Sequence, residues 1–102
     1  MGAFVAQQPN GLYCRFSSVV DTVTHWNMTF EEYVEQVQMK RYGRSYDEAV
    51  VEAHDIINNY LQPFQEIINR FRPLNNTVEE FNGILREMGS DVQLNKADYE
   101  SD

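Results

Sequence analysis

The sequence has few of the residues that carry covalent cross-links, metal sites or catalytic chemistry. Its 102 residues include one cysteine and two histidines. Because Cys14 is alone, it cannot form a disulfide within the chain, and a reducing compartment fits best. The histidines, His25 and His54, are far apart and match no zinc-ligand spacing, so we expect no metal and no cofactor. The sequence also has no phosphate-binding glycine loop and no Gly-x-Ser-x-Gly turn, and we therefore predict that the protein is not an enzyme.

Long hydrophobic runs and positive charge are also scarce. No apolar stretch approaches the roughly 20 residues of a membrane-spanning helix, and the first residues lack the segments of a signal peptide. We therefore expect a cytoplasmic protein without membrane contact. The 16 acidic residues outnumber the 8 basic ones, which gives a net charge of −8. An acidic field repels phosphate backbones, so we expect no direct nucleic-acid binding, whereas a basic partner protein is compatible with it.

Apolar residues, in contrast, are plentiful. They make up 42% of the chain, and aromatic residues make up 13%. These fractions are typical of a chain that buries one compact core, and the length leaves no room for a second domain. We predict a single compact domain over residues 1–89. Residues 90–102 are polar and acidic without any apolar period, which predicts a flexible tail.

The N-terminal residues 3–17 have the pattern of a β-hairpin. Residues 8–11 read Gln-Pro-Asn-Gly, which is favourable turn chemistry because proline presets φ and glycine accepts positive φ. In the second arm Cys14 and Phe16 share the inward face. Two strands alone are marginally stable in water, and the β-branched residues at 18–24 could supply a third strand.

Three predicted helix starts share one capping pattern. Thr29, Ser45 and Thr77 each lie three residues before a glutamate, which is the spacing of a capping box. We expect one helix over residues 30–42 and another over residues 78–88. A glycine follows each of these two helices and suits the left-handed conformation that ends a helix.

The longest apolar pattern runs through residues 45–72. Its apolar side chains recur at steps of three and four, which places them along one helical face. Pro63 interrupts the hydrogen bonding of such a helix, but the apolar spacing continues across it. We therefore predict one long helix, kinked at Pro63 and ended by Pro73. The predicted fold class is α+β, with the hairpin, two- or three-stranded, packed on three helices.

Trp26 is the only tryptophan, and it precedes the first predicted helix with His25 and Met28 nearby. In a loop, tryptophan and methionine are common contact anchors of protein interfaces. The alternative is that Trp26 closes the core by packing over the end of the long helix. We name Trp26 and Met28 as candidate partner-binding residues.

The excess of negative charge begins at residue 45, because acidic and basic residues balance over residues 1–44. A row of carboxylates on a helix can imitate a phosphate backbone and occupy a basic groove, although a solvated helix face has the same composition. The candidate partner-binding acids on the polar side of the long helix are Asp47, Glu48, Glu52 and Asp55.

Four short motifs complete the picture: Phe-Val-Ala at 4–6, Pro-Asn-Gly at 9–11, Cys-Arg-Phe-Ser at 14–17 and Trp-Asn-Met-Thr at 26–29. Together they make the first third of the chain resemble short uncharacterised accessory proteins encoded by phages and prophages of gut Firmicutes. The resemblance implies an accessory protein that acts in the cytoplasm of the bacterial host. Small acidic proteins of this kind include inhibitors of host defence, among them anti-CRISPR proteins.

From these observations we predict a non-enzymatic protein-binding accessory protein of a phage or mobile element. It would inhibit a bacterial defence effector, a basic host protein, through an acidic surface. One alternative is a structural or assembly protein that forms a homodimer through the long helix. A second alternative is an enzyme that uses Cys14 or His54, although an inward-facing strand position is more typical of a core cysteine.

Overall fold

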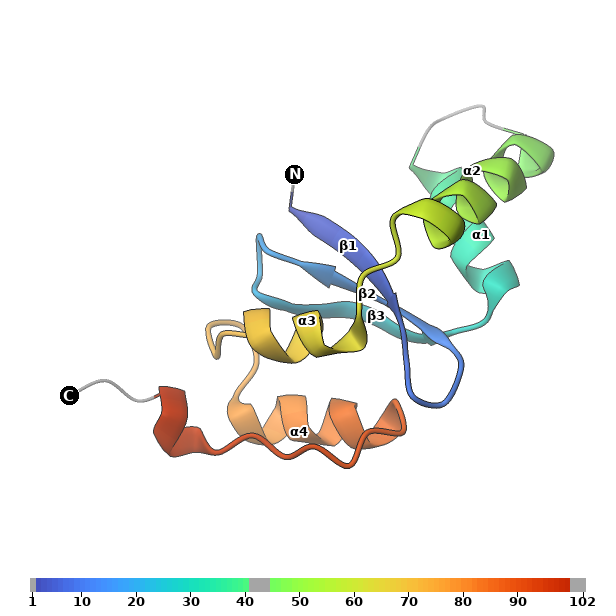
Figure 1. The fold of residues 1–102 in the computed structure, drawn as a ribbon. Coiled ribbons are helices and arrows are strands. Elements are labelled where there is room, and N and C mark those ends of the chain that lie inside the picture. Colours follow the sequence, from blue (N-terminus) through green and yellow to red (C-terminus); the bar gives the residue numbers. More distant parts are fainter. Residues whose placement is uncertain (1, 41–44, 100–102) are drawn as a thin grey trace.

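The computed structural model describes residues 2–40 and 45–99, and it confirms the α+β class. A three-stranded antiparallel sheet lies between two pairs of helices (Figure 1). The elements in chain order are β1 (Ala3–Gln7), β2 (Tyr13–Ser17), β3 (Thr22–Met28), α1 (Phe30–Met39), α2 (Tyr46–Asn59), α3 (Phe64–Arg70), α4 (Val78–Glu87) and a short 3₁₀ helix, η1 (Lys96–Tyr99).

The predicted hairpin is confirmed. β1 and β2 pair antiparallel, with Phe4 opposite Phe16. The turn is closed by the Gly11 N–H, which donates to the Gln8 carbonyl at 2.9 Å. Gly11 has φ +90°, a conformation that glycine adopts without the steric cost that a Cβ brings.

A third strand is present, but it lies further along the chain than residues 18–24. Asp21 takes a left-handed φ of 57°, which turns the chain and delays the start of β3 to Thr22. β3 pairs antiparallel with β2 and continues to Met28, with two register shifts along the way. The prediction that Trp26 and Met28 lie in a loop is therefore wrong, because both belong to this strand.

All three capping boxes are confirmed, with the hydroxyls of Thr29, Ser45 and Thr77 each accepting from the third helical amide. α1 ends at Met39 with Lys40 as its cap, before the predicted end at residue 42, and the glycine stop predicted at residue 43 lies outside the described residues. α4 ends at Glu87, one residue before the predicted end. Its C-terminus forms a Schellman motif, in which the N–H of the left-handed glycine and the N–H after it return to carbonyls of the last turn.

The single long helix over residues 45–72 is wrong, because α2 ends at Asn59 and α3 begins at Phe64. A residue before proline is disfavoured in the helical conformation, and Gln62 is instead extended beside β1. Its N–H donates to the Val5 carbonyl at 2.9 Å, which adds a short parallel bridge at the edge of β1. The chain thus gains a pairing with the sheet in place of a continued helix.

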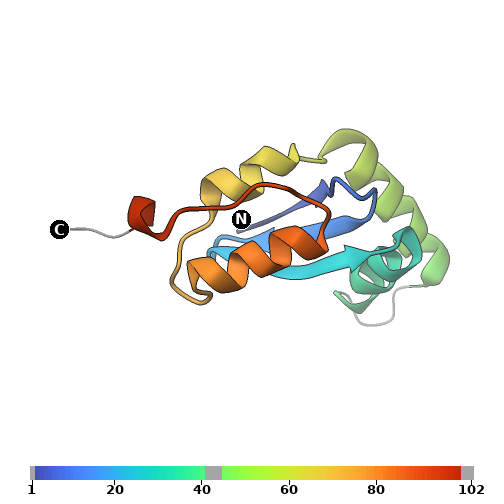
Figure 2. The same ribbon diagram turned by 90° about the horizontal axis from the view of Figure 1, so that it is seen from below.

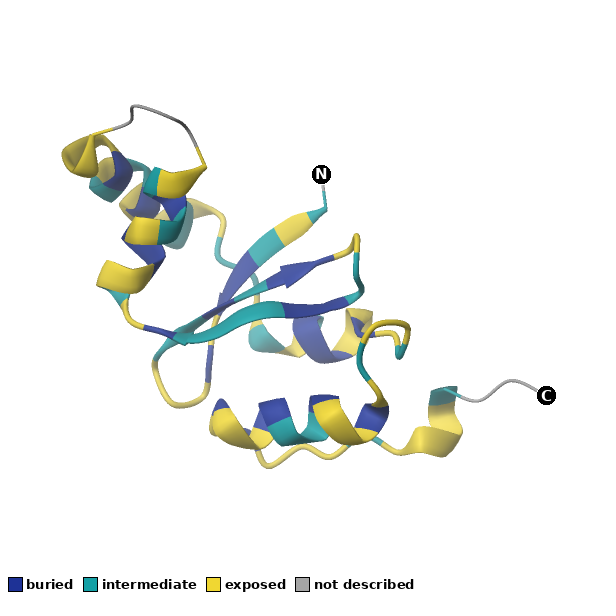
Figure 3. Cartoon of the chain, turned by 180° about the vertical axis from the view of Figure 1, so that it is seen from behind, coloured by how far each residue is buried: buried dark blue, intermediate teal, exposed yellow. Residues whose placement is uncertain are grey.

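The two helix pairs cover opposite faces of the sheet, because alternate strand residues belong to different cores. On one face, side chains of α3 and α4 pack against Ala6, Cys14 and Phe16; we call this the large core. On the other face, side chains of α1 and α2 pack against Val5 and its neighbours; we call this the small core. Figure 3 shows that buried residues recur along the strands and along the helices of both pairs.

The segment after α4 packs against the large core as far as the described chain extends. The Asn82 side chain donates to the Leu94 carbonyl at 3.0 Å and accepts from the Leu94 N–H at 2.7 Å. Tyr99 then meets Phe71 edge-on, with 5.8 Å between ring centroids. Figure 2 shows this segment running back beside α4. The packed part of the chain therefore extends beyond residue 89, and the flexibility of the tail stays a prediction.

Candidate interaction groove

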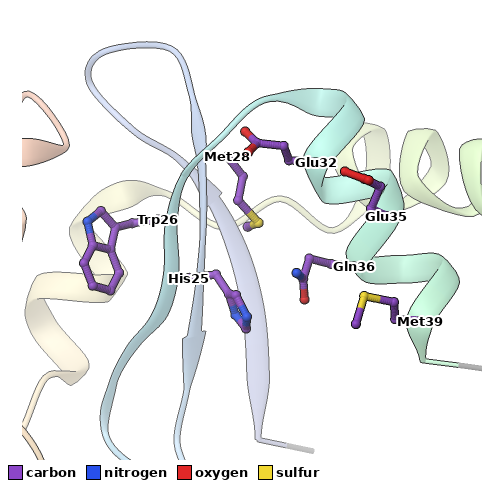
Figure 4. Close-up of a pocket in the computed structure, with 7 residues that line it drawn as sticks. All are labelled: His25, Trp26, Met28, Glu32, Glu35, Gln36 and Met39. Carbon is purple, nitrogen blue, oxygen red and sulfur yellow. The ribbon is translucent and has the colours of Figure 1, made fainter.

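A shallow groove of about 430 Å³ lies between β3 and α1. In Figure 4 the side chains of His25 and Met28 lie on the α1 side of β3, whereas Trp26 lies on the opposite side of the strand. From α1, Gln36 and Met39 extend toward the same space. The residues that line the groove are His25, Trp26, Met28, Glu32, Glu35, Gln36 and Met39.

The groove follows the free edge of β3. His25 and Trp26 are consecutive, and Figure 4 shows them on opposite faces of the strand, so a cavity that touches both extends along the strand edge. In the strand order β1-β2-β3, β3 has a strand neighbour on one side only. Apart from the pairing with β2, no backbone–backbone hydrogen bond joins residues 22–28 to another part of the described chain. Such an edge is a template for a further strand.

The walls of the groove combine apolar contact area with one fixed aromatic ring. Trp26 is half-buried, and its indole Nε1 donates to the Glu87 carboxylate at 3.3 Å, which ties it to the end of α4. Met28 is 6% exposed and belongs to the small core, so it supports the groove from below. Met39, in contrast, is 77% exposed at the end of α1 and offers a flexible apolar contact.

The rim of the groove is acidic. Glu32 and Glu35 project from exposed positions on α1, and none of the seven lining residues is lysine or arginine. One Glu32 oxygen accepts the Thr29 N–H at 2.9 Å, so this carboxylate is held at the helix start by the capping box. The groove therefore presents apolar surface bordered by negative charge.

The structure does not bring the predicted acids of α2 to this groove. Glu48, Glu52 and Asp55 are spaced by four and three residues, which places them along one side of α2, whereas Asp47 lies on a different side. Glu48 completes the capping box at Ser45, and none of the four lines the groove. Trp26 and Met28 thus both line the groove, whereas all four acids of α2 lie away from it.

Four lining residues on α1 were not identified as site residues from the sequence: Glu32, which was assigned only to a capping box, and Glu35, Gln36 and Met39. They lie off the buried stripe of that helix, which consists of Tyr33, Val34 and Val37. Their spacing of three to four residues was a usable signal for a shared face. The strand that forms the other wall could not be inferred from local pattern, because β3 was expected to end before Trp26.

The two residues considered for catalysis lie in different surroundings. Cys14 is fully buried, and burial raises the pKa of its thiol to about 12, whereas a reactive cysteine has a lowered pKa. His54 is exposed and its ring packs against that of Phe30, with centroids 4.6 Å apart and the ring planes tilted by 35°. Within residues 2–40 and 45–99, no group of three or more His, Cys, Asp or Glu side chains is arranged to hold a metal ion.

No helix in the described part of the chain is both long and apolar enough to cross a membrane. Comparisons with protein-family models, with curated proteins and with solved structures found no match. The groove and its edge strand are therefore the observations from which a function is argued.

Proposed function

We propose that the protein is a non-enzymatic binding protein that takes up a basic, extended segment of a partner protein along the free edge of β3. The carrying observation is the groove that touches both faces of this edge strand and has carboxylates but no basic residue in its lining. In strand addition, backbone hydrogen bonds supply affinity and alternate side chains supply specificity.

The chemistry of the groove defines the partner segment. Side chains on one face of the added strand meet Trp26, and those on the other face meet His25 and Met39. Apolar or long aliphatic side chains suit these contacts, since the stems of lysine and arginine cover apolar surface while their charges stay in water. Their charges then lie near Glu32 and Glu35, where opposite charge speeds association and favours the correct partner.

The biological setting belongs to the same proposal. The resemblance of residues 2–35 to phage and prophage proteins supports an accessory protein of a mobile element in the cytoplasm of a bacterial host. Defence effectors that grip nucleic acid carry basic surfaces, because phosphate binding requires lysine and arginine. Such an effector is the partner that we propose, and occupation of its basic segment is the proposed mode of inhibition.

Trp26 makes the test direct, because the only tryptophan of the chain lies in the groove. We would titrate the protein with a peptide of alternating lysine and valine and follow the tryptophan fluorescence. A second peptide carries glutamate in place of lysine, and a third carries N-methyl groups on alternate amides, which removes the donors of strand pairing. We expect saturable binding of the first peptide only, weakened by added salt.

Charge reversals locate the binding surface. Glu35→Lys is expected to lower the affinity for the lysine peptide by about tenfold. The same charge reversal at Asp91, which is exposed and away from the groove, is expected to leave that affinity within about twofold. If reversal of Glu48, Glu52 and Asp55 abolished binding while Glu35→Lys did not, the acidic side of α2 would be the surface instead. Equal binding of the N-methylated peptide would exclude strand addition.

The homodimer alternative is checked by light scattering at two protein concentrations. The continuous helix on which it was based is absent, since residues 45–72 form two helices that pack into different cores. We expect a monomer at both concentrations. A stable dimer would favour the assembly alternative, and loss of that dimer on addition of the lysine peptide would place its interface at β3.

A further inference from the structure

A second cavity, of about 320 Å³, lies between the α1–α2 pair and the strands β1 and β2. Its volume falls at the lower end of the range for small-molecule sites. Val5 from β1, together with Ile56 and Tyr60 from α2 and its C-terminal cap, gives it apolar lining. The cavity is separate from the interaction groove, since the two share no lining residue.

One wall of this cavity contains a polar group without a partner. Tyr33 lines the cavity and is 2% exposed. Its hydroxyl is buried and has no hydrogen-bond partner among the described residues. Buried polar side-chain atoms in folded proteins are nearly always hydrogen-bonded, so an orphan of this kind calls for an explanation. Burial and the charge of Glu52 raise the pKa of Tyr33 to about 12, so the hydroxyl is a proton donor at neutral pH.

The cavity is also positive in a strongly acidic protein. Arg15 and Lys40 line it, and no aspartate or glutamate does. Arg15 is held in place because its guanidinium donates to the Thr24 hydroxyl at 3.0 Å. Glu52 is the charged group that acts on Tyr33 from α2, opposed by Arg15 from β2. Two cations with one carboxylate near the hydroxyl favour a single negative charge over a doubly charged phosphate.

We propose that this cavity binds a small organic monocarboxylate with an apolar body. One carboxylate oxygen accepts a hydrogen bond from the Tyr33 hydroxyl, and the negative charge of the carboxylate is balanced by Arg15 and Lys40. The body of the ligand lies against Val5, Ile56 and Tyr60. The ligand thus supplies the hydrogen-bond acceptor that the protein itself does not offer to Tyr33. The site is independent of the partner-binding groove.

Octanoate is the probe for the test, and binding is followed by NMR as backbone amide shifts of ¹⁵N-labelled protein. We expect saturable shifts at Val5, Tyr33, Lys40 and Ile56. Octanol and octylamine, which have the same apolar chain without the carboxylate, are expected to bind at least about tenfold more weakly. Inorganic phosphate tests whether the charge alone suffices, and we expect no saturable shifts at these residues.

Tyr33→Phe removes the hydroxyl and keeps the ring. We expect an unchanged or higher thermal midpoint, because an unsatisfied group is lost, and an octanoate affinity at least about fivefold weaker. Lys40→Gln, at an exposed position, is expected to lower the octanoate affinity by a similar factor. Lys96→Gln on η1 is the matched control and is expected to leave this affinity unchanged. Octanoate affinity unchanged in Tyr33→Phe, octanol binding as tight as octanoate, or no saturable shifts at the cavity would each overturn the proposal.

Discussion

The two faces of the sheet are filled in different ways. On one face, α3 and α4 build the large core from large side chains, with the rings of Phe71 and Phe81 stacked at 3.9 Å between centroids. On the other face, α1 and α2 build the small core with residues such as Val37, Ala49 and Ala53. The groove and the Tyr33 cavity both lie against α1. We therefore expect the large core to contribute most of the stability, whereas the two sites that we propose both lie beside the small core.

The largest expected effect separates the two cores directly. Phe81→Ala removes one ring of the stack and leaves a cavity, so we expect the free energy of unfolding to fall by about 3–5 kcal/mol. Val37→Ala deletes two carbons from the small core and is expected to cost about 2 kcal/mol. Urea unfolding measured by circular dichroism gives both values. Equal losses of unfolding free energy in the two variants would contradict the larger contribution to stability that we assign to the large core.

A smaller effect is expected where α4 is tied to the hairpin. Gly89 has φ +88°, and a Cβ there would lie 3.0 Å from the Cβ of Asn10. We expect Gly89→Ala to cost about 1–2 kcal/mol. Gly83→Ala is the matched control within α4, where the added Cβ meets only an arginine side chain at 3.9 Å. Helix propensity predicts that this control is stabilised by about 0.5–1 kcal/mol in the same urea measurement.

Each core also contains a buried group that loses its proton only at high pH: the Cys14 thiol in the large core and the Tyr33 hydroxyl in the small core. Burial raises the pKa of Cys14 from 9.0 to about 12 and contributes to raising that of Tyr33 from 10.0 to about 12. In both cases the folded state keeps a proton that the unfolded state has lost, so stability is full below pH 9 and decreases as the pH rises toward 12. The thiol alone should cost about 1 kcal/mol by pH 10.

The alkaline effect can be assigned to the two cores with single variants. Cys14→Ala should flatten the decrease between pH 9 and 10, and Tyr33→Phe should flatten it mainly above pH 10. Thermal unfolding at a series of pH values provides the measurement. A decrease that persists unchanged in both variants would show that other groups cause it.

The smallest effect on stability is expected in the groove itself. Glu35 is exposed on α1, and Glu35→Lys should change the free energy of unfolding by less than about 0.5 kcal/mol. The same variant is expected to lower the affinity for the lysine peptide strongly. A large loss of stability in urea would mean that Glu35 supports the fold, and the proposed division between stabilising and binding surfaces would be wrong at this point.

Local patterns were sufficient where the physics is local. The capping boxes at Thr29, Ser45 and Thr77 and the turn at Gly11 depend on residues within a few positions, and all were predicted correctly. The helix over residues 45–72 was misjudged because apolar spacing does not reveal which core a side chain enters. Ala53 and Ile67 continue one pattern, yet they pack on opposite faces of the sheet.

The candidate site depended on tertiary contacts and was predicted only in part. Trp26 and Met28 were identified from composition, and both line the groove. The strand that contains them was expected over residues 18–24. Asp21 makes a turn there, so the strand begins only at Thr22 and continues through Trp26 to Met28. The orphan hydroxyl of Tyr33 is a property of packing among β1, β2, α1 and α2, and no spacing in the sequence indicates it.

The bridge at Gln62 makes the two edges of the sheet unequal. On the β1 side, Gln62 already occupies the Val5 carbonyl, and the next residue, Pro63, has no N–H to extend the pairing. Within residues 2–40 and 45–99, no comparable bridge is formed at the β3 edge. If a strand adds at β3, the β1 bridge works against head-to-tail stacking of further copies through β1, because the Val5 carbonyl is already occupied. The bridge at Gln62 thus protects the β1 edge against the pairing of copies edge to edge, which is the process that starts a fibre.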